Sequence, residues 1–100
     1  MRLTPAELAA LREALAGEDY SGASLFGSRV DDTRRGGDVD LLLYSRQSPF
    51  MLAHRVASRY AQVMDARLDV LVVDPLHPTD EQRALLATLT LEPLDDKLRA

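Results

Sequence analysis

Two segments with apolar side chains on both faces of a strand, residues 38–44 and 67–73, constrain the fold of this chain most. The first reads Asp-Val-Asp-Leu-Leu-Leu-Tyr and the second reads Arg-Leu-Asp-Val-Leu-Val-Val. A strand that is apolar on both faces lies inside a sheet, with other elements covering both sides. Between the segments, four apolar residues recur at helical spacing and predict a buried stripe: Leu52, Val56, Tyr60 and Val63. This strand–helix–strand alternation predicts a layered α/β domain.

Capping signals and apolar periodicity predict the remaining elements. Residues 4–7, Thr-Pro-Ala-Glu, combine a capping box with a proline in the first helical turn, and Gly17 is a typical helix stop. Ser48-Pro49 indicates the start of the middle helix by the same logic, and a second capping box indicates a helix that begins at Thr79. Residues 21–26 are predicted to form a short strand. The predicted fold is therefore α/β, with helices flanking a small mixed sheet of three strands, or of four.

The C-terminal residues have alternative interpretations. Residues 89–92 form either a short edge strand, which would be the fourth, or the frayed end of the preceding helix. Residues 95–100 are expected to form a mobile end of the chain. The apolar residues Leu89, Leu91 and Leu94 could instead dock on a partner or on a second copy of the chain.

Length and composition exclude several classes of protein. The 100 residues correspond to one domain, 1–100, and a formal net charge of −4 argues against a basic nucleic-acid coat, so we expect no direct nucleic-acid binding. The chain has no cysteine, which excludes disulfides and thiolate metal sites, and its two histidines, His54 and His77, lie far apart. Carboxylates are therefore the expected ligands of any metal, which points to Mg²⁺. No apolar run is long enough to span a membrane, so we expect a cytoplasmic protein.

Three carboxylates at strand positions carry the clearest chemical signal. Asp38 and Asp40 are two residues apart at the start of an apolar strand, so both side chains point to one face. Like charges this close are costly unless a cation lies between them. Asp69 lies in the second apolar strand and joins this face if the two strands are neighbours, whereas Asp65 and Asp74 are rivals at strand edges. The alternative is that all these acids are simply solvated at strand ends.

A Gly-Ser turn precedes the carboxylates. Gly27 and Ser28 follow the predicted strand 21–26 and open a polar turn, or a short helix and a loop, over residues 29–37. Glycine lets a phosphate approach the backbone closely, and the following N–H groups and the serine hydroxyl can donate to phosphate oxygens. The alternative interpretation is a plain turn.

Together these features resemble the signature of a known enzyme superfamily. Residues 25–29, Leu-Phe-Gly-Ser-Arg, are followed by a polar loop and by residues 37–42, Gly-Asp-Val-Asp-Leu-Leu. The combination is similar to the DNA-polymerase-β-like nucleotidyltransferases, and more narrowly to the minimal nucleotidyltransferases of bacteria and archaea. The resemblance covers residues 20–73 and implies the polymerase-β-like fold.

The resemblance also implies roles for individual residues. The carboxylates would bind two Mg²⁺ ions and carry catalysis, with the last one helping to activate the acceptor hydroxyl: Asp38, Asp40 and Asp69. The turn would hold the phosphates of the nucleotide, with an arginine assisting unless it is merely solvated: Gly27, Ser28 and Arg29. The substrate in this family is commonly ATP, a hydroxyl attacks its α-phosphorus, and pyrophosphate leaves.

The resemblance further implies a protein partner. Minimal nucleotidyltransferases typically accompany a helical HEPN-domain protein, an RNase toxin that they silence by adding AMP to a tyrosine. We therefore expect an antitoxin that acts as a protein adenylyltransferase, in a hetero-oligomer or as a homodimer. One alternative is an antitoxin that neutralises the HEPN protein by binding, with little or no catalysis. Another is transfer to a small molecule such as an aminoglycoside, against which the short chain argues.

Overall fold

The two apolar segments lie side by side at one end of a mixed sheet. The computed structural model describes residues 3–30 and 38–98, and the sheet strands within them have the order β3-β2-β1-β4. β2 pairs with β3 in parallel, whereas β1 pairs with β2 and with β4 in antiparallel fashion. The strand bounds are β1 Gly22–Phe26, β2 Val39–Tyr44, β3 Leu68–Val73 and β4 Glu92–Pro93. The predicted α/β class with a mixed sheet is confirmed, and the described part of the sheet has four strands.

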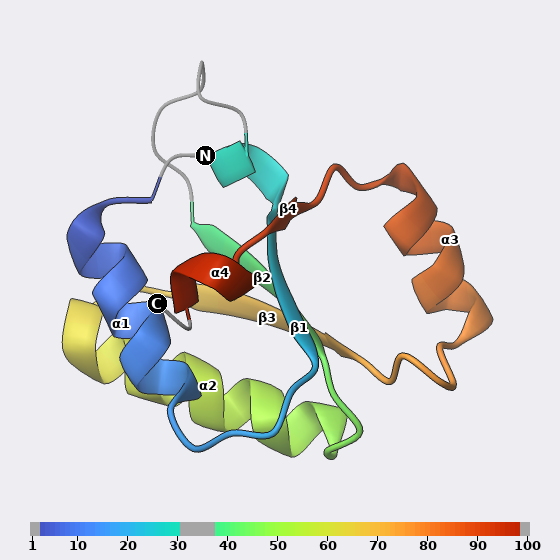
Figure 1. Ribbon diagram of the computed structural model, residues 1–100, viewed down its shortest axis with the longest axis horizontal. Helices are drawn as coiled ribbons and strands as arrows, with labels where there is room; N and C mark the ends of the chain where they lie inside the picture. Colours follow the sequence, from blue (N-terminus) through green and yellow to red (C-terminus); the bar gives the residue numbers. More distant parts are fainter. Residues whose placement is uncertain (1–2, 31–37, 99–100) are drawn as a thin grey trace.

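Helices connect and cover the strands. Their bounds are α1 Pro5–Leu15, α2 Pro49–Met64, α3 Asp80–Thr88 and α4 Asp95–Leu98, and a 3₁₀ turn, η1, spans Gly27–Val30. α1 and α2 contact each other and α2 also packs on β3, the strand that it connects to β2. α3 lies by itself, apart from the other three helices (Figure 1). The sheet therefore has one face under an α1–α2 layer.

The capping signals are confirmed at two helix starts and differ at a third. The hydroxyl oxygens of Thr4 and Thr79 each accept a hydrogen bond from the backbone N–H three residues on. In turn, the backbone N–H of each threonine donates to the side chain of that third residue, a Glu in the first helix and a Gln in the other. Ser48 precedes α2, but its side chain makes no capping hydrogen bond within the described residues. Pro49 in the first turn supplies the helical φ there instead.

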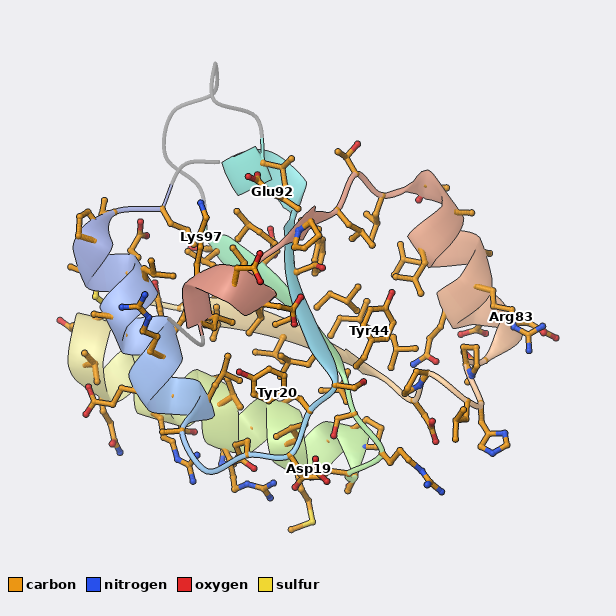
Figure 2. The ribbon with its side chains drawn as sticks, in the orientation of Figure 1. Asp19, Tyr20, Tyr44, Arg83, Glu92 and Lys97 are labelled. Atoms are coloured by element: carbon orange, nitrogen blue, oxygen red, sulfur yellow. The ribbon has the colours of Figure 1, made fainter. Side chains whose placement is uncertain are left out.

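β2 is the central strand that its composition predicts. Leu41 and Leu43 belong to the core cluster that includes residues of α1 and α2, and both are fully buried. Leu42 points to the opposite face and is fully buried as well. Tyr44 follows on that second face and lies between the sheet and α3 (Figure 2). Both faces of β2 are thus covered along its leucines, Leu41 to Leu43.

Two predictions about burial are wrong. Val63, placed in the buried stripe of α2, is 48% exposed, because the stripe of Leu52, Val56 and Tyr60 continues at a spacing of four to Met64, which packs against the core. Residues 95–98 are not a mobile end, because they form α4, whose Leu98 is buried in the core.

The C-terminal segment belongs to the fold of the chain itself. Leu94 is fully buried in the core, so it does not serve as a docking residue. Oδ1 of Asp95 accepts a hydrogen bond of 3.1 Å from the N–H of Ala23 in β1, and Arg12 in α1 donates to the carbonyl oxygen of Lys97. The edge-strand interpretation is confirmed in kind, although β4 lies at Glu92–Pro93 rather than at residues 89–92.

A bonded network ties the loop after α1 to α2. The Glu18 carboxylate, whose side chain is 7% exposed, accepts from Arg55 and Arg59 at 2.9–3.0 Å. The hydrogen bond from Arg55, outweighing the opposing effect of burial, lowers the pKa of Glu18.

In the part of the chain that the structure describes, no helix is long and apolar enough to cross a membrane.

A candidate active site at the start of two parallel strands

Asp40 and Asp69 are direct neighbours across the parallel β2–β3 ladder. The register pairs Val39 with Leu68 and Asp40 with Asp69, so each carboxylate occupies the second position of its strand. The flanking residues Val39 and Leu68 turn into the core, which places both aspartates on the opposite face of the sheet. The condition on which the three-carboxylate prediction depended, adjacent strands with Asp69 on the face of Asp40, is met.

The two carboxyl groups lie within hydrogen-bonding reach of each other, and the pKa of Asp40 reflects this. Partial burial of Asp40 is the largest cause that raises its pKa, followed by the charge of Asp69 and the hydrogen bond between the two groups. The charge of Asp38 raises it further, and Arg67 opposes these effects. Such a pair either shares a proton or binds a cation.

Asp38 lies just before β2 rather than inside it, and its side chain is exposed. It is near enough for its charge to act on Asp40, as the spacing of two residues predicts. The structure thus brings the three predicted carboxylates to one end of the sheet, with Asp40 and Asp69 as the close pair and Asp38 at the solvent side.

Gly27 lies against the Asp40 carboxylate. It follows the last residue of β1, Phe26, whose register partner is Asp40. A β-carbon at position 27 would lie 2.3 Å from Oδ2 of Asp40, and the backbone of Gly27 has φ +77°, which side-chain-bearing residues rarely adopt. Both the conformation and the close approach therefore favour glycine here, and the turn leads directly to Asp40 and Asp69.

The other predicted phosphate contacts are described in part. The backbone of Ser28 and Arg29 continues η1 from Gly27, while their side chains lie outside the described part of the chain. The polar segment 31–37, which includes Gly37 of the motif, also lies outside the described residues.

The rival acids are placed away from the pair. Asp74 follows the last residue of β3 and accepts from the N–H of Leu76, so the length of the strand, roughly 17 Å, separates it from Asp69. Asp65 caps the C-terminus of α2 in the left-handed conformation and is exposed. Of the three candidates for the third acid, Asp69 alone lies beside Asp40.

Arg67 is a site residue that lies outside the motif. It immediately precedes β3, and its Nε and Nη2 atoms both lie 2.9 Å from Oδ1 of Asp69. The signal was present in the sequence, since residues 67 and 69 share a strand face by their spacing of two. The arginine side chain is 73% exposed, so it partly neutralises the acids from the solvent side.

The donor set suits Mg²⁺. As the side chains lie, no three Asp, Glu or His residues among those described are close enough to enclose a metal ion. Mg²⁺ is, however, usually held by one or two carboxylates together with water and substrate phosphates. Asp40 and Asp69 supply such a pair of oxygen ligands, and Gly27 leaves the space beside Asp40 that any side chain would fill.

A separate hollow of about 310 Å³ lies at the opposite end of β2 and β3. Its lining residues come from the ends of those strands and from the loop before β1: Asp19, Tyr20, Ser21, Ser45, Arg46, Pro75 and Leu76. Tyr20 and Asp19 lie beside the lower part of β1 (Figure 2). The hollow lacks an acid pair, so the chemistry of the carboxylates belongs to the other end of the sheet.

No family model matches the chain, and none of the curated proteins matches it either.

Proposed function

We propose that this chain is a magnesium-dependent nucleotidyltransferase of polymerase-β-like fold. The observation that carries the proposal is the adjacency of Asp40 and Asp69 across two parallel strands, with Gly27 in contact range of Asp40. The sequence resemblance assigns these positions to metal and phosphate binding. The order of these features along the chain also supports the proposal. A turn follows β1, Asp38 and Asp40 lie at the start of β2, and Asp69 lies on β3.

The residues of the chain have separate tasks in this reaction. Asp38, Asp40 and Asp69 would hold the metal ions, which neutralise the charge of the triphosphate when bound. The backbone N–H groups that follow Gly27 donate to phosphate oxygens, and the absence of a side chain at Gly27 lets the phosphates approach.

The transfer itself forms one bond and breaks one. The acceptor hydroxyl oxygen bonds to the α-phosphorus of ATP, its proton passes to the Asp69 carboxylate, and the bond from the α-phosphorus to the bridging oxygen breaks. Pyrophosphate leaves and the acceptor carries AMP. Because Asp40 and Asp69 face solvent on one side of the sheet, a hydroxyl on another protein can reach them.

The acceptor that we propose is a tyrosine of a helical HEPN-domain partner, an RNase toxin that this chain silences as its antitoxin. The test incubates this protein with the product of its neighbouring gene, the expected HEPN-domain partner, together with labelled ATP and Mg²⁺. Label is expected on the partner with the wild type and with Asp74→Asn, which lies at the far end of β3. Label is expected to disappear with Asp40→Asn and with Asp69→Asn; equal labelling by all four proteins contradicts the proposal.

A second candidate function, neutralisation of the partner by binding alone, is favoured by exposed apolar residues. Phe50 and Met51 at the start of α2 are 84% and 59% exposed, and Leu76 after β3 is 64% exposed. All three follow the ends of the parallel strands, at the end of the sheet opposite the acids.

The two functions separate in a protection assay. If binding suffices, Asp40→Asn still protects cells from the partner, while Phe50→Ser loses protection. Val63→Ser is the matched control, because Val63 is also exposed but lies at the other end of α2. If catalysis is required, Asp40→Asn loses protection even though the complex still forms.

A further inference from the structure

Arg67 binds one of the two carboxylate oxygens of Asp69, an atom at which a metal ion would also bind. Both its Nε and its Nη2 lie 2.9 Å from Oδ1 of Asp69, while the Asp69 carboxyl is also within hydrogen-bonding reach of Asp40. Asp69 thus has two neighbours within hydrogen-bonding reach, the guanidinium of Arg67 and the carboxyl of Asp40. No ligand position on Oδ1 is open to a cation unless the arginine moves.

The arginine also acts on the second acid of the pair. Burial and the charges of Asp69 and Asp38 raise the pKa of Asp40, and Arg67 alone among the causes of that shift opposes them by its charge. A guanidinium that favours the ionised form of Asp40 and binds Asp69 does, from one side, what a metal ion would do between the two carboxylates.

The pairing is easily exchanged. The Arg67 side chain is 73% exposed and that of Asp69 is 39% exposed, so water rehydrates both groups when they separate. Exposed ion pairs of this kind are weak and are screened by salt. The network at Glu18 differs, since there a carboxylate that is 7% exposed holds Arg55 and Arg59 in place.

We propose that Arg67 is the resident counter-ion of the acid pair and that a divalent cation binds by displacing it from Asp69. This inference rests on the proposed metal site. Arg67 is then a positioning residue: it keeps the pair of acids compact in the metal-free protein and competes directly with the metal. It follows that removal of the guanidinium tightens metal binding, although it removes a stabilising contact.

The experiment is a titration of Mn²⁺ into the nucleotide-free protein, followed by the electron paramagnetic resonance signal of free Mn²⁺. The proteins are the wild type, Arg67→Gln, Arg67→Lys and the control Arg83→Gln. Arg83 is exposed on α3, which follows the far end of β3, and its side chain points away from the sheet (Figure 2). Thermal melts check that each variant is folded.

The expected result is a Mn²⁺ affinity up to about fivefold tighter for Arg67→Gln than for the wild type, the size that exposed ion pairs reach. Arg67→Lys, which keeps the charge, and Arg83→Gln should stay near the wild type, and the gain should shrink in high salt. An unchanged or weaker affinity of Arg67→Gln, with a wild type that binds Mn²⁺, overturns this inference and leaves the proposed function standing. Absence of Mn²⁺ binding in the wild type and in Arg67→Gln overturns both.

Discussion

Gly27 and Asp40 are so close that a β-carbon on Gly27 would lie 2.3 Å from Oδ2 of Asp40. The contact joins the end of β1 to the start of β2, because Phe26 and Asp40 are register partners. It explains why glycine is favoured at position 27: any side chain there would be strained and would push the Asp40 carboxylate aside. The position is thereby sensitive to a single methyl group, which makes it the sharpest test of the site.

We predict that Gly27→Ala impairs the site by more than its effect on stability accounts for. Alanine at φ +77° costs about 1–2 kcal/mol, and the methyl group forces the Asp40 carboxylate aside. Gly17→Ala is the matched control, since Gly17 has φ +79° but an added β-carbon there meets no atom within 4 Å. Chemical denaturation should show similar losses of stability from the shared backbone strain, while Mn²⁺ binding weakens only in Gly27→Ala. Equal Mn²⁺ affinities in the two variants would contradict a role of the Gly27–Asp40 contact in metal binding.

We predict that Asp40→Asn stabilises the metal-free protein at neutral pH while abolishing transfer. Burial and the neighbouring carboxylates raise the pKa of Asp40 in the folded state. The folded chain therefore holds this proton more tightly than the unfolded chain, and stability falls as pH rises from the ordinary carboxyl range through the raised pKa. The variant should gain about 0.5–1 kcal/mol above that window, since water still screens the group, and gain nothing below it.

The measurement for Asp40→Asn is urea denaturation across a pH series, without metal. Asp74→Asn serves as the control, because Asp74 lies after β3 and an asparagine oxygen can still accept from the N–H of Leu76. A variant that is less stable than the wild type at neutral pH would show that the carboxylates of Asp40 and Asp69 do not repel each other in solution.

The sequence predicts the frame of this site better than its details, for a physical reason. The apolar residues of β2 and β3 predict two neighbouring strands, and alternation along a strand then places Asp40 and Asp69 on one face. Only β2 is interior, however: β3 forms the edge of the described sheet and is half-buried in its middle, because the apolar pattern specifies burial of side chains and not the number of neighbouring strands. The pairing of Arg67 with Asp69 depends on the rotamer of a long side chain at the surface, which no local pattern specifies. The burial of the C-terminal segment could not be predicted for a different reason. Leu94 and Leu98 are core residues, but the residues around them show no helical or strand periodicity, so only the tertiary fold identifies them as buried.

We predict that Glu18→Gln destabilises the protein by about 1–2 kcal/mol, the range of hydrogen bonds to charged groups that water partly reaches. The hydrogen bond from Arg55 lowers the pKa of Glu18, so its contribution is present above the ordinary carboxyl range and is lost as pH falls through the lowered pKa. Denaturation at neutral and at acidic pH checks both statements. Glu13→Gln, on the exposed surface of α1, is the control and should change stability by less than about 0.5 kcal/mol. A loss for Glu18→Gln that persists at low pH would exclude the ion pair as its cause.

We predict that the C-terminal segment stabilises the fold itself rather than a complex. Leu94 is fully buried in the core between β4 and α4, so Leu94→Ala should cost about 2–4 kcal/mol, from lost burial and from the cavity left behind. Leu85→Ala, at a leucine of α3 that is 44% exposed, should cost less than about 1 kcal/mol. Thermal denaturation of the isolated chain measures both. If Leu94→Ala left the isolated chain as stable as Leu85→Ala does and weakened only its binding to a partner, the segment would be an interface, and the place of Leu94 in the core would be wrong.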